Sequence, residues 1–161
     1  STNDLAASGG TCTVSIHAWP TTLGPLSTTL SRTCTFGGTA TTTTDQIKVT
    51  GVSAILAWNP LTKDFGNIDV NSLSSPETFT LSNTGTSPAT TCTAPTIDDT
   101  TDFSITTDNC GVSDIPIGDH CTVQITANPT SVGSHSTTLS RTCGEGGTAT
   151  TTSLQSKGTV I

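Results

Sequence analysis

The sequence predicts an all-β protein, and three observations lead to this fold class. Threonine, a β-branched residue that favours strands over helices, accounts for 39 of the 161 residues. Several short stretches alternate apolar and polar residues, as a strand with one buried face does. Few segments repeat apolar residues at the 3.6-residue spacing of an amphipathic helix.

A stretch near the start of the chain recurs at its end. Residues 11–52 match residues 120–161 at 26 of 42 positions, without a gap. A repeat this clear indicates that the two stretches share one type of structure. In both copies Cys, Val, Ile and Ala alternate, at Cys12, Val14, Ile16 and Ala18 and again at Cys121, Val123, Ile125 and Ala127.

Each copy is predicted to be a β-hairpin. The alternating strand ends at Pro20 or Pro129, and Gly24 or Gly133 supplies the turn. Residues 27–32 and 136–141 then return as the second strand. In the first copy a Gly-Gly turn, a Thr-rich strand and a closing strand complete residues 11–52.

The remaining strands are expected in residues 53–161. They are marked by the apolar residues of 53–58, by Phe65, Ile68 and Val70, by Phe79 and Leu81, and by Ile97, Phe103 and Ile105. Short strands at this spacing are typical of a β-sandwich of about seven strands. We therefore expect residues 53–161 to form one complete repeat. Residues 1–52 would supply only the later strands, three or so, of a preceding repeat.

Six cysteines allow fifteen disulfide connectivities. Cys12 and Cys34, like Cys121 and Cys143, lie symmetrically about the predicted turns, where directly paired strands would bring them together. The preferred pairing is therefore Cys12–Cys34, Cys121–Cys143 and, by elimination, Cys92–Cys110. Reduced buried thiols are the alternative. Zinc is disfavoured because no CxxC occurs and the histidines do not recur in the repeat.

Composition limits the function classes. The chain has 5 basic and 12 acidic residues, a net charge of −7, which disfavours nucleic acid as a partner. Paired cysteines and few charges indicate an oxidising, extracellular location, secreted or on a cell surface. Neither a signal peptide nor a membrane span is found, and no motif calls for a cofactor.

The candidates for chemistry are few, and no catalytic residue is predicted. Asp64-Phe65-Gly66 spells a kinase metal-binding motif, but its companion motifs are missing, so Phe65 is interpreted as a core residue. Lys63 and Lys157 are candidates for an isopeptide bond to a nearby Asn or Asp. An acidic loop offers weak calcium ligands, although a solvated loop is favoured. Its carboxylates are Asp98, Asp99, Asp102 and Asp108.

An ordered set of motifs in residues 53–161 resembles the choice-of-anchor D type repeat. The motifs are Asp64-Phe-Gly-Asn-Ile68, Phe79-Thr-Leu-Ser-Asn-Thr-Gly85, Asp102-Phe-Ser-Ile105, Cys110, Gly118, Cys121-Thr-Val123 and Pro129-Thr-Ser-Val-Gly133. The resemblance implies an immunoglobulin-like β-sandwich related to ASH and MSP domains, found in tandem in bacterial secreted and surface proteins. It transfers no catalytic residues. It also implies a Cys110–Cys121 disulfide, which leaves Cys92 with Cys143 and conflicts with the pairing preferred from the repeat.

These observations favour a non-enzymatic structural subunit of an extracellular fibre, pilus-like filament or surface stalk. The half repeat would leave an apolar assembly face open to another chain, through β-strand addition. That face comprises Val14, Ile16, Ala18 and Leu30. Self-association into a homopolymer is expected, or the chain belongs to a longer tandem array. A surface adhesin or carbohydrate-binding module, with a surface glycan as partner, is the alternative, although Trp19 and Trp58 are interpreted as packing or interface residues.

Overall fold

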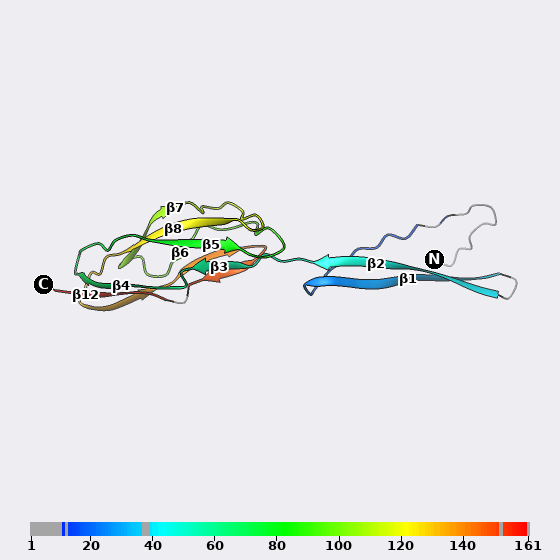
Figure 1. Cartoon of the computed structure of the whole chain (residues 1–161), viewed down its shortest axis with the longest axis horizontal. Helices are drawn as coiled ribbons and strands as arrows, with labels where there is room; N and C mark the ends of the chain where they lie inside the picture. The colour runs from blue at the N-terminus through cyan, green and yellow to red at the C-terminus, as the bar shows by residue number, and fades with distance from the viewer. Residues whose placement is uncertain (1–10, 12, 37–38, 152, 161) are drawn as a thin grey trace. The chain divides into compact units, whose positions relative to one another are not determined.

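The structure, a computed structural model, describes residues 11, 13–36, 39–151 and 153–160. These residues form strands and no helix, so the prediction of an all-β fold is confirmed (Figure 1). The chain divides into two compact units, residues 1–52 (unit 1) and residues 53–161 (unit 2). That unit 1 is half of a repeat stays a prediction.

Unit 1 contains one long antiparallel pair, β1 (Gly24–Phe36) and β2 (Thr39–Gly51). The pairing runs from Gly24↔Gly51 to Phe36↔Thr39. The hairpin predicted between the first alternating stretch and residues 27–32 is therefore wrong. Residues 13–21 form no strand, and β1 pairs with β2 instead.

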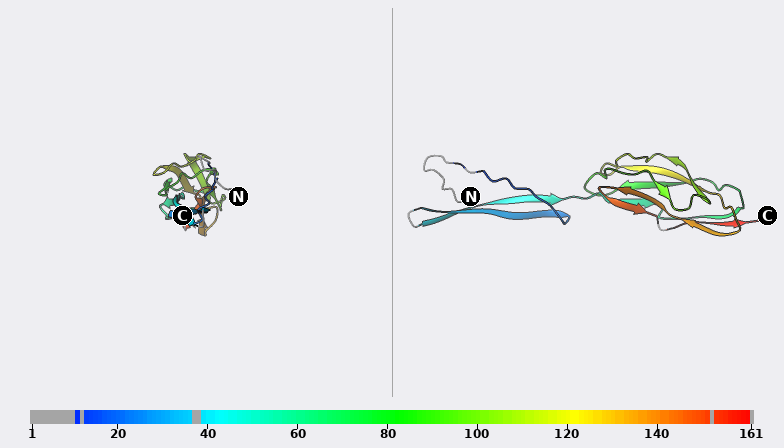
Figure 2. Two further views of the ribbon diagram at one scale, coloured as in Figure 1. Left: turned by 90° about the vertical axis from the view of Figure 1, so that its right-hand side faces the viewer. Right: turned by 180° about the vertical axis from the view of Figure 1, so that it is seen from behind.

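Unit 2 is a sandwich of two layers (Figure 2). One layer has the order β3 (Leu56–Asn59), β5 (Glu77–Asn83), β8 (His120–Ala127), β7 (Phe103–Asp108). The other layer comprises two three-stranded sheets. Their orders are β11 (Gly147–Thr150), β10 (Leu139–Cys143), β6 (Thr96–Ile97) and β4 (Thr62–Asp69), β12 (Ser153–Thr159), β9 (Gly133–Thr137).

Unit 2 has more and shorter strands than the roughly seven expected. Thr138 separates β9 from β10, and β11 ends at Thr150 before β12 begins at Ser153. Each of these two stretches therefore contributes to both three-stranded sheets of its layer. Breaks of this kind carry no sequence signal here, because the run of Thr and Ser continues through them.

The core of unit 2 follows the period-two pattern of its strands. Phe79 and Leu81 of β5 and Val123 and Ile125 of β8 are fully buried, and Leu139 of β10 faces them from the other layer. Alternate residues on the same strands are more exposed. Trp58 of β3 is also buried, and its indole N–H donates a hydrogen bond to the carbonyl of Ala149 at 3.1 Å.

The hairpin predicted for the second copy of the repeat is also wrong. The strand β8 pairs antiparallel with β5 and β7, whereas β9 and β10 lie in the opposite layer. Cys121 and Cys143 are consequently not cross-strand neighbours.

The disulfides preferred from the repeat, Cys121–Cys143 and Cys92–Cys110, are corrected by this topology. The bonds present are Cys92–Cys143 and Cys110–Cys121, the pairing that the resemblance implied. Cys34 is exposed and forms no disulfide with another described cysteine. Its predicted partner, Cys12, lies outside the described residues, so that bond stays a prediction.

In each unit, a pair of opposed glycines forms the last residue pair of an antiparallel strand pairing. Gly24 is opposite Gly51 in unit 1, and Gly133 is opposite Gly158 in unit 2. The repeat aligns Gly158 with Val49, so the two registers differ by two residues. A Cβ atom at Gly51 or Gly158 would lie 2.0 Å from a backbone carbonyl oxygen, that of Thr22 or Ser131 respectively. In each unit, the residue paired with the turn glycine is therefore itself a glycine, although its aligned position differs between the units. The nearby backbone oxygen leaves no room for a side chain at that position.

Gly158→Val would place in unit 2 the residue that the aligned position carries in unit 1. We expect the free energy of unfolding to fall by about 3 kcal/mol, the upper end of the overpacking range, because a backbone oxygen cannot move aside as a side chain can. Urea denaturation measures this. Lys157→Ala, an exposed neighbour, serves as the control. Equal stability of the two variants would contradict the close approach.

Candidate functional site

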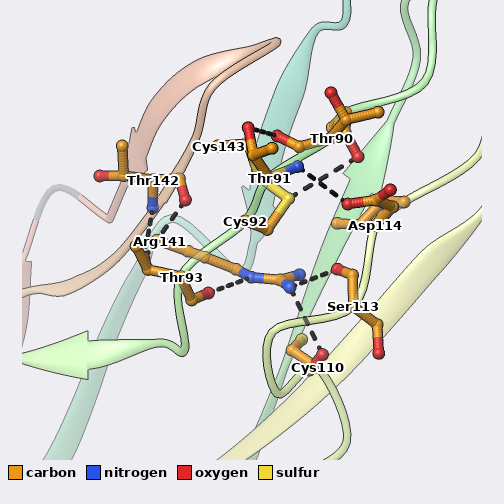
Figure 3. Close-up of a disulfide and its surroundings, with 12 residues drawn as sticks. Thr90, Thr91, Cys92, Thr93, Cys110, Ser113, Asp114, Arg141, Thr142 and Cys143 are labelled. Carbon is orange, nitrogen blue, oxygen red and sulfur yellow. Dashed lines mark hydrogen bonds between the residues drawn. A yellow bond between two sulfur atoms is a disulfide. The ribbon is translucent and has the colours of Figure 1, made fainter.

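Arg141 of β10 is a buried cation of unit 2, with 1% of its surface exposed. Its Nε donates to the carbonyl oxygen of Thr93 at 2.9 Å, and its Nη2 donates to that of Ser113 at 2.6 Å (Figure 3). Further contacts join Nη2 to the carbonyls of Cys110 and Gly111, at 3.4 and 3.2 Å. A guanidinium has five N–H donors in a fixed plane, and here backbone carbonyls surround the Nε and Nη2 side of that plane.

Both disulfides of unit 2 lie beside Arg141. Its Nη1 is 3.3 Å from Sγ of Cys121, which is bonded to Cys110. Cys143 follows two residues later on β10 and is bonded to Cys92, the residue before Thr93. Burial lowers the pKa of Arg141, while the charges of Asp108 and Asp114 oppose this shift. The arrangement holds three backbone segments together and presents no reactive group to a substrate.

Arg141→Lys is expected to lower the free energy of unfolding of unit 2 by about 3 kcal/mol. Lysine keeps the charge but lacks the planar fork, so several buried carbonyls lose a charged donor. Denaturation without reductant measures the loss, and Ser136→Ala on the exposed side of β9 is the matched control. A lysine variant as stable as that control would show that the carbonyl cluster does not depend on the guanidinium.

A second polar cluster ties the acidic loop to the loop after β8. Asp102 is buried, and its Oδ1 accepts hydrogen bonds from the backbone N–H and the hydroxyl of Thr130, at 2.7 and 2.8 Å. Its Oδ2 lies 2.8 Å from Nδ1 of His135, and Nε2 of that ring lies 2.9 Å from the carbonyl oxygen of Ser131. Burial by itself raises the pKa of Asp102, but the hydrogen bonds from Thr130 and the interaction with His135 together lower it below 3.8.

The other carboxylates of the acidic loop bind the protein's own polar groups. Asp99 accepts from the N–H groups of Thr101 and Asp102, and Asp98 accepts from the hydroxyl of Thr138. Asp108 accepts from two N–H groups beyond β7. Within the described residues, no three His, Cys, Asp or Glu side chains are grouped to hold a metal ion. The weak calcium candidates are therefore not brought together there.

The lowered pKa of Asp102 predicts a contribution to acid stability. A carboxylate with a depressed folded-state pKa stabilises the fold above its ordinary pKa of 3.8 and loses that contribution as the pH falls through its folded-state value. Asp102→Asn should therefore be less stable than the native chain at pH 7, with a difference that shrinks below pH 3.8. Denaturation from pH 7 to pH 2 measures this. A difference independent of pH would contradict the role of the charge.

The predicted assembly face is exposed in unit 1. The exposed fractions of Val14, Ile16 and Leu30 are 60%, 47% and 39%, and Ala18 is exposed as well. The same residue types at the aligned positions of unit 2 are fully buried. These are Val123, Ile125, Leu139 and Ala127. One sequence pattern therefore occurs in two environments.

In unit 2, β8 pairs with β5 and β7, and its apolar face belongs to a core shared with the other layer, including Leu139 and Leu154. Residues 13–18 carry the same alternating pattern but form no strand, and their side chains are exposed. Trp19, which follows them, is 89% exposed.

Phe65 and Lys63 make structural contacts, while an isopeptide bond from Lys63 or Lys157 stays a prediction. Phe65 packs against Phe103 with ring centroids 6.1 Å apart, as expected for a core residue. Lys63 forms an ion pair with Glu77 at 2.5 Å, and Lys157 is exposed on β12. The described part of the chain contains no helix capable of spanning a membrane.

An apolar groove on unit 2 was missed by the sequence analysis. It has a volume of about 360 Å³ and lies between β6 and β7. Its lining residues are Pro95, Thr96, Ile97, Thr100, Phe103, Ser104 and Ile105. Ile97, Phe103 and Ile105 are predicted from the sequence as strand residues, but nothing local in the sequence shows that the two layers leave an opening there.

Several solved structures have similar folds. An ASH/PapD-like domain of human CEP192 is 14% identical, with a TM-score of 0.49, over 68% of this chain and 88% of that chain. The VesB protease of Vibrio cholerae is 18% identical, with a TM-score of 0.47, over 63% of this chain and 31% of that chain. WR4, an MSP family member of C. elegans, is 7% identical, with a TM-score of 0.43, over 66% of this chain and 99% of that chain.

The likeness to VesB spans about a third of that protease, and the protease activity is that protein's own. No curated protein matches the sequence. A family model does match, over residues 54–158, and it describes a HYDIN/CFA65/VesB-like, Ig-like domain. The immunoglobulin-like fold that the resemblance implied is thereby confirmed. The chain belongs to the HYDIN/CFA65/VesB-like family of Ig-like domains.

Proposed function

We propose that this chain is a non-enzymatic structural module of an extracellular fibre, pilus-like filament or surface stalk, and that it self-associates through β-strand contacts of unit 1. The observation that carries the proposal is the exposure of Val14, Ile16 and Leu30, whose aligned residues in unit 2 are fully buried. Burying a side chain of this size is worth about 1.5–3 kcal/mol. Covering these residues therefore favours association with another chain.

The construction of unit 2 supports a structural role. Two disulfides and a buried guanidinium fix its loops, and Asp102 is bound by Thr130 and His135 of the same unit. Disulfides of this kind persist in oxidising surroundings, which supports an extracellular location. The finer resemblance to the choice-of-anchor D type repeat of secreted and surface proteins agrees with this location.

The distribution of charge favours contact between unlike units. Unit 1 carries two basic and two acidic side chains and has no net charge. Unit 2 carries three basic and ten acidic side chains, a net charge of −7. Two copies of unit 2 repel each other, whereas unit 1 of one copy approaches unit 2 of another without net repulsion. A head-to-tail contact of this kind propagates into a filament when it does not close into a ring.

A surface adhesin or carbohydrate-binding module is a second candidate. The exposed indole of Trp19 favours it, because a flat aromatic side chain with a polar N–H is suited to stacking on a glycan. Trp58 is buried, so a glycan that quenches tryptophan fluorescence by contact would report on Trp19.

Sedimentation velocity of the full chain at rising concentration tests the structural role. We expect the mean mass to rise with concentration and added salt to change it little. Val14→Ser with Ile16→Ser should keep the chain monomeric, since both residues are exposed in the single chain and their loss leaves unit 2 intact. Val112→Ser, at an exposed position of unit 2, is the matched control. A monomer at every concentration would refute the proposal.

A further inference from the structure

Strand β7 forms a free edge of unit 2. In the sheet order β3-β5-β8-β7 it pairs with β8 on one side, and among the described strands no other pairs with it on the opposite side. An edge strand presents unpaired N–H and C=O groups that another chain can bind. Exposed backbone alone gives little specificity, so a second feature is needed to identify the occupant.

The apolar groove supplies that feature. It runs beside β7, towards β6 of the other layer, and Phe103 and Ile105 line it. An added strand at this edge would point alternate side chains into the groove, which would receive apolar residues at every second position. The occupant is thus expected to be an extended segment with period-two apolar residues and little charge.

Residues 13–18 have these properties. Val14, Ile16 and Ala18 alternate with Ser15 and His17, the segment forms no strand, and it carries no carboxylate. The carboxylates near the groove, such as Asp98 and Asp108, therefore do not repel it.

The existing ladder of unit 2 already shows the required pairing. In β8 and β7, Ile125 is opposite Ile105 and Ala127 is opposite Phe103, in antiparallel register. Ile16 and Ala18 occupy the positions aligned with Ile125 and Ala127. An antiparallel strand on the outer edge of β7 would repeat these two pairs, with Ile16 beside Ile105 and Ala18 beside Phe103.

We propose that residues 13–18 of one copy add as an antiparallel strand to the free edge of β7 in a second copy, with Val14, Ile16 and Ala18 entering the groove between β6 and β7. This site deepens the proposed self-association and rests on it. Main-chain hydrogen bonds supply the strength of the joint, and the groove supplies its register.

Cysteine trapping between two singly substituted chains tests the site. In the proposed register His17 lies opposite Ser104, and both residues are exposed. His17→Cys and Ser104→Cys are placed in separate full-length chains, one carrying a mass tag, in a background with Cys12→Ser and Cys34→Ser. Mild oxidation should then join the two different chains, which a non-reducing gel resolves by mass.

The matched control is Ala57→Cys, an exposed position on β3 at the opposite edge of the same sheet. We expect at least about tenfold more mixed dimer with Ser104→Cys than with Ala57→Cys, because pairing raises the effective concentration of the two thiols. Ser15→Cys with Thr107→Cys, the pair that corresponds to Gln124 and Thr107 beyond the bulge in β7, provides a second trap in case Ser104→Cys does not fold.

The outcomes separate the site from the proposed function. Association in the centrifuge with equal trapping at β7 and β3 would overturn the site and leave the self-association standing. A chain carrying both His17→Cys and Ser104→Cys is oxidised in parallel. A crosslink within that chain, with none between the two singly substituted chains, would overturn the role of a second copy. No association and no trapping would overturn both proposals.

Discussion

The order of unit 2 depends on one buried cation. The guanidinium of Arg141 donates to carbonyl oxygens of Thr93 and Ser113, and the two disulfides hold the same segments in place. Aromatic residues make up 4% of the chain, so large apolar side chains contribute less to this fold than to most. A charge buried among carbonyls is costly unless each partner is in position, which makes alternative arrangements of these loops unfavourable.

The sequence was sufficient to predict features that depend on near neighbours. The all-β class and the burial of Val123, Ile125 and Ala127 follow from a two-residue period, which can be recognised in any stretch of six residues. The predicted strand partners are wrong, because strands that follow one another along this chain are not always neighbours in one sheet. In a sandwich the strands before and after a turn can belong to different layers, as β8 and β9 do. The symmetric placement of Cys121 and Cys143 therefore had no structural meaning.

The features of the candidate site that the sequence did not reveal are those made by distant segments. Nothing around Arg141 distinguishes it from Arg32, the aligned arginine of unit 1, because its carbonyl partners come from residues far away in the chain. The groove between β6 and β7 is likewise formed by two strands of different layers. Val14 is exposed and the aligned Val123 is buried, although the sequence around them is alike. The burial of a side chain therefore depends on the surrounding strands, which the local sequence does not specify.

The Cys92–Cys143 bond has a mechanical consequence for unit 2. The two cysteines are 51 residues apart, so a pulling force applied along the chain passes through the sulfur bridge and bypasses the residues between them. An extended chain gains about 3.3–3.6 Å per residue, so the bridge withholds on the order of 170 Å of extension. If unit 2 were pulled open from its ends, only the residues outside the bridge would extend. The covalent bond between Cys92 and Cys143 would then bear the force.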